Sequence, residues 1–365
     1  MAAIRRLLFI TLAGSLGVTS TGFRANVPVD TRSLDEIYAA AQNESGPLIV
    51  ASGGDAQSQG DTIRNAWAQR FPRIPLNLTV DLSKYHDSRI DRAFYEKNEN
   101  TDVALLQTLH DFPYWKEQNR LMYYKPATFN DIYNGEKDLD GAYYPILTFN
   151  FGRFIYDSTK LNASLIPKSY ADLTDPRYKD KLVLTLPNDD DAILYLFHTI
   201  VSKYGFRWLD GLIANNPMWV RGTGTPTFVL QQEHNNATSK LALTITSAAA
   251  PANATYFHVK EPQAPEQYMS WTQTAAIFAS TKRPNSAQLF ISWLLSDEFQ
   301  STLQSQGRPI VRRSLDQGEL YLSNTTQVDG FRVFMNDRRF VERWRLQFET
   351  SLGTAQGPSA LTFVP

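Results

Sequence analysis

Cysteine is absent from the 365 residues of this chain. Its absence excludes disulfide bonds and catalysis by a thiol, so large packed cores must carry the stability. An excess of charge of either sign is lacking as well, because the formal net charge is −1. A chain so close to neutral gives no reason to expect nucleic acid as a partner. With 42% hydrophobic and 20% charged residues, the composition is that of an ordinary globular protein.

Motifs of the common enzyme and metal-site classes are also missing. The chain has no G-x-S-x-G nucleophile motif, no H-E-x-x-H zinc motif and no phosphate loop with its lysine. The five histidines show no spacing typical of metal ligands; they are His86, His110, His198, His234 and His258. We therefore predict no catalytic residues, no cofactor and no metal, although His86 and His110 lie close to predicted loops where either could serve a ligand.

The first twenty residues have the layout of a secretory signal peptide. Arg5 and Arg6 precede an apolar run, Leu7–Val18, and small residues continue to Ser20. The run is shorter than the ~20 residues that a membrane-spanning helix needs. We expect cleavage after Ser20 and a secreted chain, extracellular or, in a bacterium, periplasmic. A retained signal anchor is the alternative.

Sequons of the N-x-S/T type occur at six places, and each would accept a glycan if the chain passed through a eukaryotic secretory route. They begin at Asn43, Asn77, Asn162, Asn236, Asn253 and Asn324. Their number favours a secreted glycoprotein of eukaryotic, fungal-like origin.

The length exceeds what one hydrophobic core usually supports, so two lobes are expected. The first lobe begins with the succession strand–helix–strand–helix–strand. This succession predicts a parallel, doubly wound sheet with ligand loops at the carboxyl ends of its strands. The predicted strands are Leu48–Ala51, Leu76–Val80 and Asp102–Leu106, and the predicted helices are Asp61–Phe71 and Arg89–Lys97.

Two long apolar runs have the pattern of crossings between the lobes. Tyr143–Tyr156 leads into the second lobe, and Tyr268–Ala279 leads back. The predicted fold class is α/β, with each lobe a mostly parallel sheet flanked by helices. The predicted division is a signal peptide at 1–20, a lead-in at 21–46, lobe 1 at 47–150 plus 263–317, lobe 2 at 151–262, and a C-terminal helical extension at 318–365.

The middle of the chain resembles a known family, the type II periplasmic solute-binding proteins, especially the branch named for ferric-iron import. Four segments carry the resemblance in the order typical of family members: FIYDSTKL (Phe154–Leu161), PKSYADLTDP (Pro167–Pro176), RYKDK (Arg177–Lys181) and LVLTL (Leu182–Leu186). The resemblance extends from about Leu48 to Ser314. It implies a two-lobed, periplasmic-binding-protein-like II fold that closes around a small solute, and in bacteria delivery of that solute to an ABC-type importer.

Loops at the ends of the predicted strands should line the cleft between the lobes. The loops Ser52–Asp55 and Gly222–Thr225 are rich in glycine and small polar residues. Such loops suit anions when free N–H groups and a helix dipole point the same way, but turns and helix caps have the same composition. The predicted ligand-binding residues are Ser52, Gly53, Gly54, Asp55, Gln107, Thr108, Asp189, Asp190, Asp191, Arg221, Thr223, Gly224, Thr225, Ser247 and Trp271.

Three adjacent carboxylates, Asp189, Asp190 and Asp191, follow a predicted buried strand and precede a predicted helix. One of them can cap that helix, and the three together favour a cation, whether an organic amine or a hard metal such as Ca²⁺. Trp271 and Tyr144 in the crossings offer rings that stack on a cationic or ring-shaped ligand, unless they belong to the core.

Ferric iron is a specific possibility that the family resemblance raises. Ferric-binding members commonly supply adjacent tyrosines after the strand that corresponds here to Leu241–Thr246, and a histidine in the first loop. This chain has Ser247–Ala250 at the first place and no histidine within Ser52–Gln57. We therefore predict a ligand other than bare ferric iron held by that set.

The leading interpretation is a secreted, monomeric, non-enzymatic protein that closes two lobes around a small solute. An alternative is a hydrolase or transferase on the same scaffold that uses Asp189–Asp191. A third interpretation assigns partner binding to the arginine-rich tail, Asp329–Leu352, which otherwise forms a helix docked on a lobe.

Overall fold

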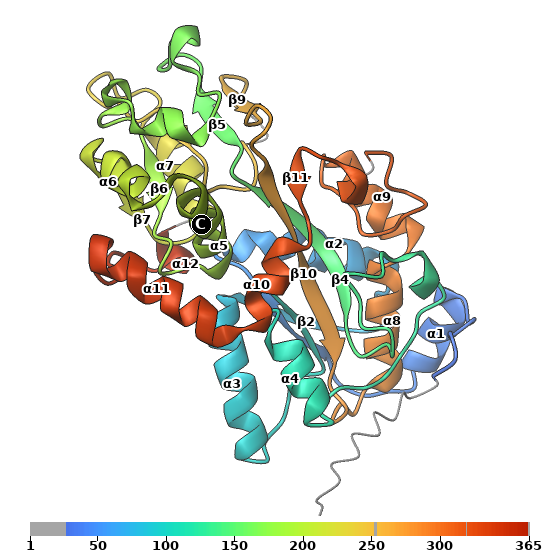
Figure 1. Cartoon of the computed structure of the whole chain (residues 1–365). Coiled ribbons are helices and arrows are strands. Elements are labelled where there is room, and N and C mark those ends of the chain that lie inside the picture. Colours follow the sequence, from blue (N-terminus) through green and yellow to red (C-terminus); the bar gives the residue numbers. More distant parts are fainter. Residues whose placement is uncertain (1–26, 252–253, 319, 364–365) are drawn as a thin grey trace, which may run out of the picture.

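The computed structural model describes residues 27–251, 254–318 and 320–363. The predicted signal peptide and the sequon at Asn253 lie outside the described residues. Among the helices of these three ranges, none has both the length and the apolar composition needed to cross a membrane. Figure 1 shows two lobes joined by long strands, with the C-terminal segment lying across them.

The sheet of lobe 1 contains the predicted parallel strands. Its order is β11-β10-β3-β1-β2, in which β10 is Tyr268–Ile277 and β11 is Thr326–Gln327. β1 (Leu48–Gly53) pairs in parallel with both β2 (Leu76–Asp81) and β3 (Val103–Leu106). β3 is buried along its whole length, as expected of a strand covered on both faces. The helices of this part are α1 (Leu34–Ala41), η1 (Gln57–Gly60), α2 (Asp61–Arg70), α3 (Ser83–Tyr95), α4 (Asp111–Glu117) and η2 (Phe129–Asp131).

Two crossing strands join the lobes and give the sheet of lobe 1 an antiparallel part. β4 (Tyr144–Phe151) and β10 (Tyr268–Ile277) pair antiparallel with each other, and β10 also pairs antiparallel with β3. The predicted run Tyr143–Tyr156 is interrupted at Gly152, whose φ of +93° favours glycine. After this interruption, β5 (Phe154–Asp157) belongs to lobe 2.

Lobe 2 contains a three-stranded antiparallel sheet, β8-β5-β9, and a parallel pair, β6-β7. The predicted strand Leu241–Thr246 is reduced to β8 (Leu243–Thr244), and beyond it the Thr246 hydroxyl accepts the hydrogen bond from the Thr185 N–H. The other elements are η3 (Ala163–Leu165), η4 (Tyr170–Thr174), η5 (Pro176–Tyr178), β6 (Val183–Thr185), α5 (Asp191–Tyr204), α6 (Phe206–Ala214), β7 (Met218–Val220), α7 (Thr225–Gln232) and β9 (Phe257–Lys260).

Lobe 1 has an aromatic core between the sheet and its helices. Trp67 on α2 lies with its ring centroid 5.6 Å from that of Trp293 on α8 (Pro284–Leu294). α8 is followed by α9 (Asp297–Ser305) and also packs against α1, which contributes Ile37 to the same core. The helix of the predicted lead-in is thus part of the packing of lobe 1.

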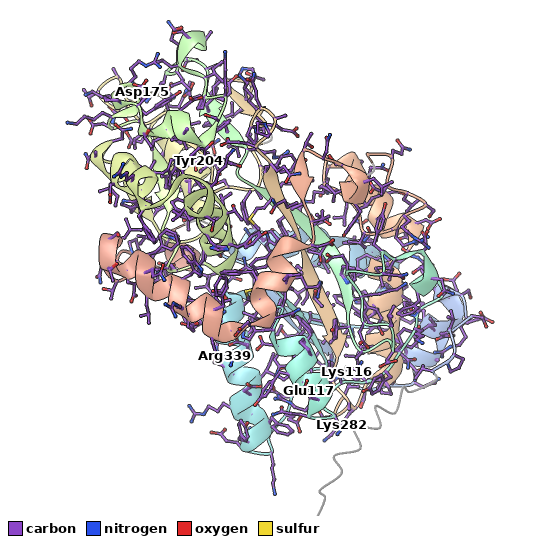
Figure 2. The ribbon with its side chains drawn as sticks, in the orientation of Figure 1. Lys116, Glu117, Asp175, Tyr204, Lys282 and Arg339 are labelled. Carbon is purple, nitrogen blue, oxygen red and sulfur yellow. The ribbon has the colours of Figure 1, made fainter. Side chains whose placement is uncertain are left out.

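Lobe 2 has a separate core around α5. The ring of Phe197 lies 5.7 Å from Trp208 of the same lobe and 6.0 Å from Phe348 of the C-terminal segment. Figure 2 marks the two ends of the molecule, with Asp175 in lobe 2 and Lys282 at the far end of lobe 1. With two cores, each lobe can keep its internal packing while the cleft between them opens or closes.

The C-terminal segment contacts both lobes, and it includes a strand that the sequence did not predict. β11 pairs with β10, while α10 and α11 pack against α5. Arg332 of α10 pairs with Glu136 of lobe 1 at 3.1 Å, and Arg338 of α11 pairs with Asp191 of lobe 2 at 2.6 Å. The elements of the segment are η6 (Leu320–Leu322), β11 (Thr326–Gln327), α10 (Gly330–Asn336), α11 (Arg338–Leu352) and α12 (Ala360–Phe363).

Candidate functional site

The cleft between the lobes holds two adjoining cavities, of about 60 Å³ and about 210 Å³. Loops that follow β1 and β3 line it from lobe 1, and the starts of α5 and α7 line it from lobe 2. The two cavities share Gly53, Gln59, Phe149, Thr223 and Gln273. Because walls from both lobes meet here, the cavities change shape whenever the lobes move relative to each other.

The loop Gly222–Thr225 has N–H donors toward the cleft, and two of its carbonyls accept hydrogen bonds from side chains of lobe 2. The Thr185 hydroxyl donates to the Gly222 carbonyl at 2.8 Å, and the Ser247 hydroxyl donates to the Thr223 carbonyl at 2.6 Å. Gly222 has a φ of +80°, a conformation that favours glycine. The N–H groups at the start of α7 therefore form a ready-made site for an anionic group.

Asp55 of lobe 1 places its own carboxylate in that anion site. Its Oδ2 accepts hydrogen bonds from the Thr223 N–H, from the Thr223 hydroxyl at 2.9 Å and from the Gly224 N–H at 3.1 Å. Its Oδ1 accepts from Gln59 Nε2 at 2.7 Å. A carboxylate from one lobe thus fills the donor set of the other, as the carboxylate or phosphate of a ligand would.

Arg308 brings a positive charge to the larger cavity. It follows α9 and shares the cavity with Thr223 and Ser247. Its guanidinium carbon lies 5.9 Å from the centre of the Phe149 ring. In the part of the chain that the structure describes, no carboxylate pairs with it, and burial lowers its pKa. Since an arginine keeps its proton at neutral pH, this cavity contains an uncompensated cation.

Aromatic rings from the two crossing strands form one wall of the cleft. The Trp271 ring lies 5.0 Å from Phe149 and 6.3 Å from Phe151, nearly parallel to both. Gln273, also on β10, donates to the Gly53 carbonyl at 2.8 Å and so fixes the loop after β1. Tyr144 does not reach the cleft, because it is fully buried in lobe 1 and donates to backbone carbonyls there.

The structure divides the acidic triplet among three different roles. Asp189 pairs with Lys84 at 2.8 Å and with Arg221 at 2.9 Å. Burial by itself would raise the pKa of Asp189, but these two cations lower it. Asp191 pairs with Arg338 at 2.6 Å and with Arg345. Both carboxylates are therefore neutralised by the protein's own cations and are not free to hold a ligand cation.

Asp190 is the triplet member that lines the smaller cavity. Its Oδ1 caps α5 by accepting from the N–H groups of Ala192 at 2.9 Å and Ile193 at 3.0 Å. Gln107 of lobe 1 donates to the same oxygen at 3.2 Å, which links the two lobes. Burial raises the pKa of Asp190 to about 6. The cap that the sequence allowed thus comes from this residue.

Most of the predicted site residues lie at the cleft, and some lie behind it. Ser52, Gly53, Gly54, Asp55, Gln107, Asp190, Thr223, Gly224, Ser247 and Trp271 line at least one of the cavities. Thr108, Asp189, Asp191, Arg221 and Thr225 line neither. Thr225 is instead engaged in the loop itself, where its hydroxyl donates to the Arg221 carbonyl at 2.6 Å.

Sequence reasoning missed several residues that line the cavities. The polar ones are Gln59, Ser83, Gln273 and Arg308, and the aromatic ones are Phe149 and Phe151. Alternation along the two crossing strands was a signal for Phe149, Phe151 and Gln273. For Arg308, the only signal was its place after the glycine that ends α9. Where ferric-binding members of the family commonly have tyrosines, the larger cavity is lined by Ala248 and Ala249. No tyrosine or histidine of the described chain lines either cavity.

Comparisons with known proteins concern the fold. Iron-bound HitA from Pseudomonas aeruginosa aligns over 84% of this chain and 100% of its own, with a TM-score of 0.64 and 16% identity. AfuA from Actinobacillus pleuropneumoniae, with fructose-6-phosphate bound, aligns over 85% and 100%, with a TM-score of 0.64 and 16% identity. An ABC-transporter substrate-binding protein from Agrobacterium tumefaciens aligns over 84% and 95%, with a TM-score of 0.71 and 10% identity.

These similarities confirm the predicted two-lobed, periplasmic-binding-protein-like fold class, and two of the proteins hold chemically unlike ligands, so the fold does not select the solute. No curated protein sequence gives a significant match. The family model described as bacterial extracellular solute-binding protein matches residues 112–326, more than half of the chain. This protein therefore belongs to the family of bacterial extracellular solute-binding proteins.

Proposed function

We propose that this protein is secreted or periplasmic and closes its two lobes around a small anionic solute, a carboxylate or a phosphate, for delivery to an ABC-type importer. The observation that carries the proposal is the uncompensated guanidinium of Arg308 in the larger cavity, beside the donors of the Gly222–Thr225 loop. Arg308 is half-buried, a position where a cation without a partner is unfavourable, and an anionic ligand supplies the missing charge.

Asp55 supports the same ligand class. It occupies the anion site with three hydrogen bonds from Thr223 and Gly224, and those donors suit a ligand carboxylate or phosphate equally well. Cavities of this size are smaller than the ~300–1,000 Å³ of typical ligand pockets. Solute entry thus requires the lobes to separate, which withdraws Asp55 from the loop and frees its donors.

The other residues that line the cavities indicate which further groups the solute can carry. The rings of Trp271 and Phe149 offer an apolar or stacking surface. Bare ferric iron is disfavoured, since the usual phenolate ligands have no counterpart in the two cavities. The hydrolase or transferase alternative gains no support from the triplet, because Asp189 and Asp191 are ion-paired and Asp190 caps a helix.

Export and glycosylation remain proposals that rest on the sequence. The five described sequon asparagines are all exposed, as a glycan requires: Asn43, Asn77, Asn162, Asn236 and Asn324. Intact-mass measurement before and after treatment with a glycosidase, on protein secreted by a eukaryotic host, tests both export and glycan attachment.

Thermal-shift measurement tests the solute class. The probes are inorganic phosphate, citrate, glutamate and fructose-6-phosphate as anions, with glucose and thiamin as uncharged and cationic comparisons. A ligand at a hundred times its Kd adds ~2.7 kcal/mol of stability. We expect at least one anion to raise the Tm of the wild type and of Arg207→Gln, an exposed arginine on α6, but not of Arg308→Gln. An anion shift that persists in Arg308→Gln, or shifts given only by the uncharged or cationic probes, contradicts the proposal.

A further inference from the structure

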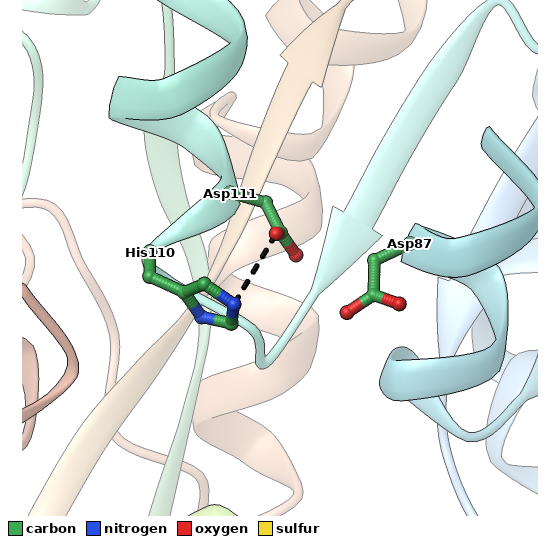
Figure 3. Close-up of side chains that lie close together, drawn as sticks. All are labelled: Asp87, His110 and Asp111. Atoms are coloured by element: carbon green, nitrogen blue, oxygen red, sulfur yellow. Dashed lines mark ion pairs between the residues drawn. The ribbon is translucent and has the colours of Figure 1, made fainter. Parts of the chain in front are cut away.

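Two acidic residues and a histidine meet where α3 packs beside the start of α4. Asp87 extends from α3, and His110 and Asp111 stand at the beginning of α4 (Figure 3). One ligand atom from each lies within 4.8 Å of the other two. None of the three lines either cleft cavity, so this cluster is separate from the solute site.

Asp111 has an unsatisfied carboxylate in this cluster. The residue is 6% exposed, and its Oδ2 has no hydrogen-bond partner. His110 Nε2 approaches Asp111 Oδ1 at 3.4 Å, while His110 Nδ1 has no partner. A buried carboxylate with an unsatisfied oxygen is unfavourable as a free anion, which favours either a proton or a cation on this group.

The charged side chains next to the cluster already have partners of opposite charge, whereas Asp87 and Asp111 do not. Asp91 pairs with Arg120 at 2.6 Å. Arg338 faces the cluster from α11, and its charge is matched by Asp191 and Glu342, each at 2.6 Å. Among the residues that the structure describes, no lysine or arginine pairs with Asp87 or Asp111.

The ionisation of the three groups is compatible with metal binding. Burial raises the pKa of Asp87 to about 6 and holds that of Asp111 well above its usual range. Burial also lowers the pKa of His110 to about 4, so its imidazole is neutral at pH 7 and keeps a free lone pair. A divalent cation would take the place of the proton and stabilise the two carboxylates in their ionised form.

We propose that Asp87, His110 and Asp111 form a binding site for a divalent transition metal of the Zn²⁺ class. One imidazole nitrogen and two carboxylate oxygens are the ligands that such ions take, with water in the open position. Two ligands of a tetrahedral ion with bonds of ~2.1 Å lie ~3.4 Å apart, which matches the separation of His110 Nε2 and Asp111 Oδ1. Asp87 is partly exposed, which leaves this side of the cluster accessible to solvent.

The competing explanation is a proton shared by the Asp87 and Asp111 carboxyl groups, with no metal. Isothermal titration of untagged, chelator-treated protein with ZnCl₂ at pH 7 separates the two. We expect one Zn²⁺ per chain in the wild type and in Asp210→Asn, an exposed control on α6, and at least a tenfold weaker Kd in Asp87→Asn and Asp111→Asn. If Asp111→Asn fails to fold, the half-exposed Asp87→Asn still provides the test.

Cobalt provides a second readout, because a protein-bound Co²⁺ ion absorbs visible light according to its ligands. We expect absorption bands of a low-coordinate Co²⁺ in the wild type that are lost in Asp87→Asn. Phosphate binding in the cleft should be the same in the wild type and these variants, which makes this test independent of the proposed solute. A wild type that takes up no stoichiometric Zn²⁺, or Zn²⁺ binding that is unchanged in both variants, overturns the proposed metal site.

Discussion

The start of α5 and the junction of α3 with α4 both gather carboxylates, and they differ in what surrounds those carboxylates. At the start of α5, Asp189 and Asp191 are held by two cations each, and Asp190 is held by helix N–H groups. At the other junction, no lysine or arginine of the described residues pairs with Asp87 or Asp111, and the neighbouring His110 is neutral at pH 7. The number of donors around a carboxylate, rather than the number of carboxylates, decides whether a site is open to a ligand.

The two regions also differ in how they take part in lobe closure. The start of α5 serves closure, because Lys84 and Gln107 reach it from lobe 1 and α11 reaches it from the C-terminal segment. At the α3–α4 junction, Asp87, His110 and Asp111 all come from lobe 1, so none of the three proposed ligands has to cross the cleft, although Arg338 of α11 faces them. Four variants should respond differently because of this difference in surroundings.

Substitution of the two arginines that pair with Asp191 should have the largest effect on the unfolding free energy. In Arg338→Ala/Arg345→Ala, a carboxylate that is 8% exposed loses its cations, which we expect to cost about 3–5 kcal/mol of unfolding free energy. Addition of Asp191→Asn should restore much of the loss. Urea denaturation measures both effects, with Arg339→Ala, a side chain 92% exposed, as the control. A loss no larger than that of the control means that Asp191 is not held by these arginines.

Asp190→Asn should change how stability depends on pH. Burial raises the pKa of Asp190 from 3.8 to about 6, so the folded state binds the proton more tightly than the unfolded state. Its stabilising effect is therefore full below about pH 4 and is lost as pH rises through 6. Relative to Asp190→Asn, which can still cap α5, the wild type should gain up to about 3 kcal/mol between pH 7 and pH 4.

Urea denaturation at pH 4, 5, 6 and 7 provides this comparison, because groups common to both proteins cancel in the difference. A difference in unfolding free energy that stays constant with pH shows that folding does not raise the pKa of Asp190.

Asp55→Ala should strengthen the binding of anions. The variant removes the carboxylate that competes for the Thr223 and Gly224 donors, and hydrogen bonds to a charged group contribute about 1.5–3 kcal/mol. We expect the Kd of inorganic phosphate to fall by about tenfold or more. Isothermal titration measures it, with Asp61→Ala as a control that removes the same charge from an exposed position. Equal affinities in the two variants contradict a competing role for Asp55.

Asp87→Asn should have the smallest effect in metal-free protein. Because this carboxylate has no cationic partner to leave behind, the unfolding free energy should change by less than about 1 kcal/mol. Denaturation in the presence of EDTA measures the change. A loss as large as that of the double arginine variant would mean that the two acidic regions are held in the same way.

The succession of strands and helices at the start of lobe 1 could be predicted from sequence, because it depends on local patterns. The apolar run of β1, the helix of α5 and the cap before it are each contained in one short segment. The shortening of β8 could not be predicted, since it depends on a hydroxyl that meets the Thr185 N–H from another strand. The break at Gly152 was equally hidden, because a glycine within a strand pattern does not reveal its φ.

The candidate site was predictable where a loop carries its own signal and not where distant segments meet. The Gly222–Thr225 loop was found because its donors are consecutive. Its occupation by Asp55 was not found, because 168 positions separate Asp55 from Thr223. Arg308 and the partners of the acidic triplet were missed for the same reason: their importance lies in which charges they meet, and long-range packing decides that.

The most direct test of the account is mass spectrometry of the small molecules released when the purified protein is denatured, with the wild type and Arg308→Gln isolated in parallel. We expect a compound with a carboxylate or phosphate group, stoichiometric with the wild type and absent from the variant. Release of the same uncharged or cationic compound from both proteins would contradict it.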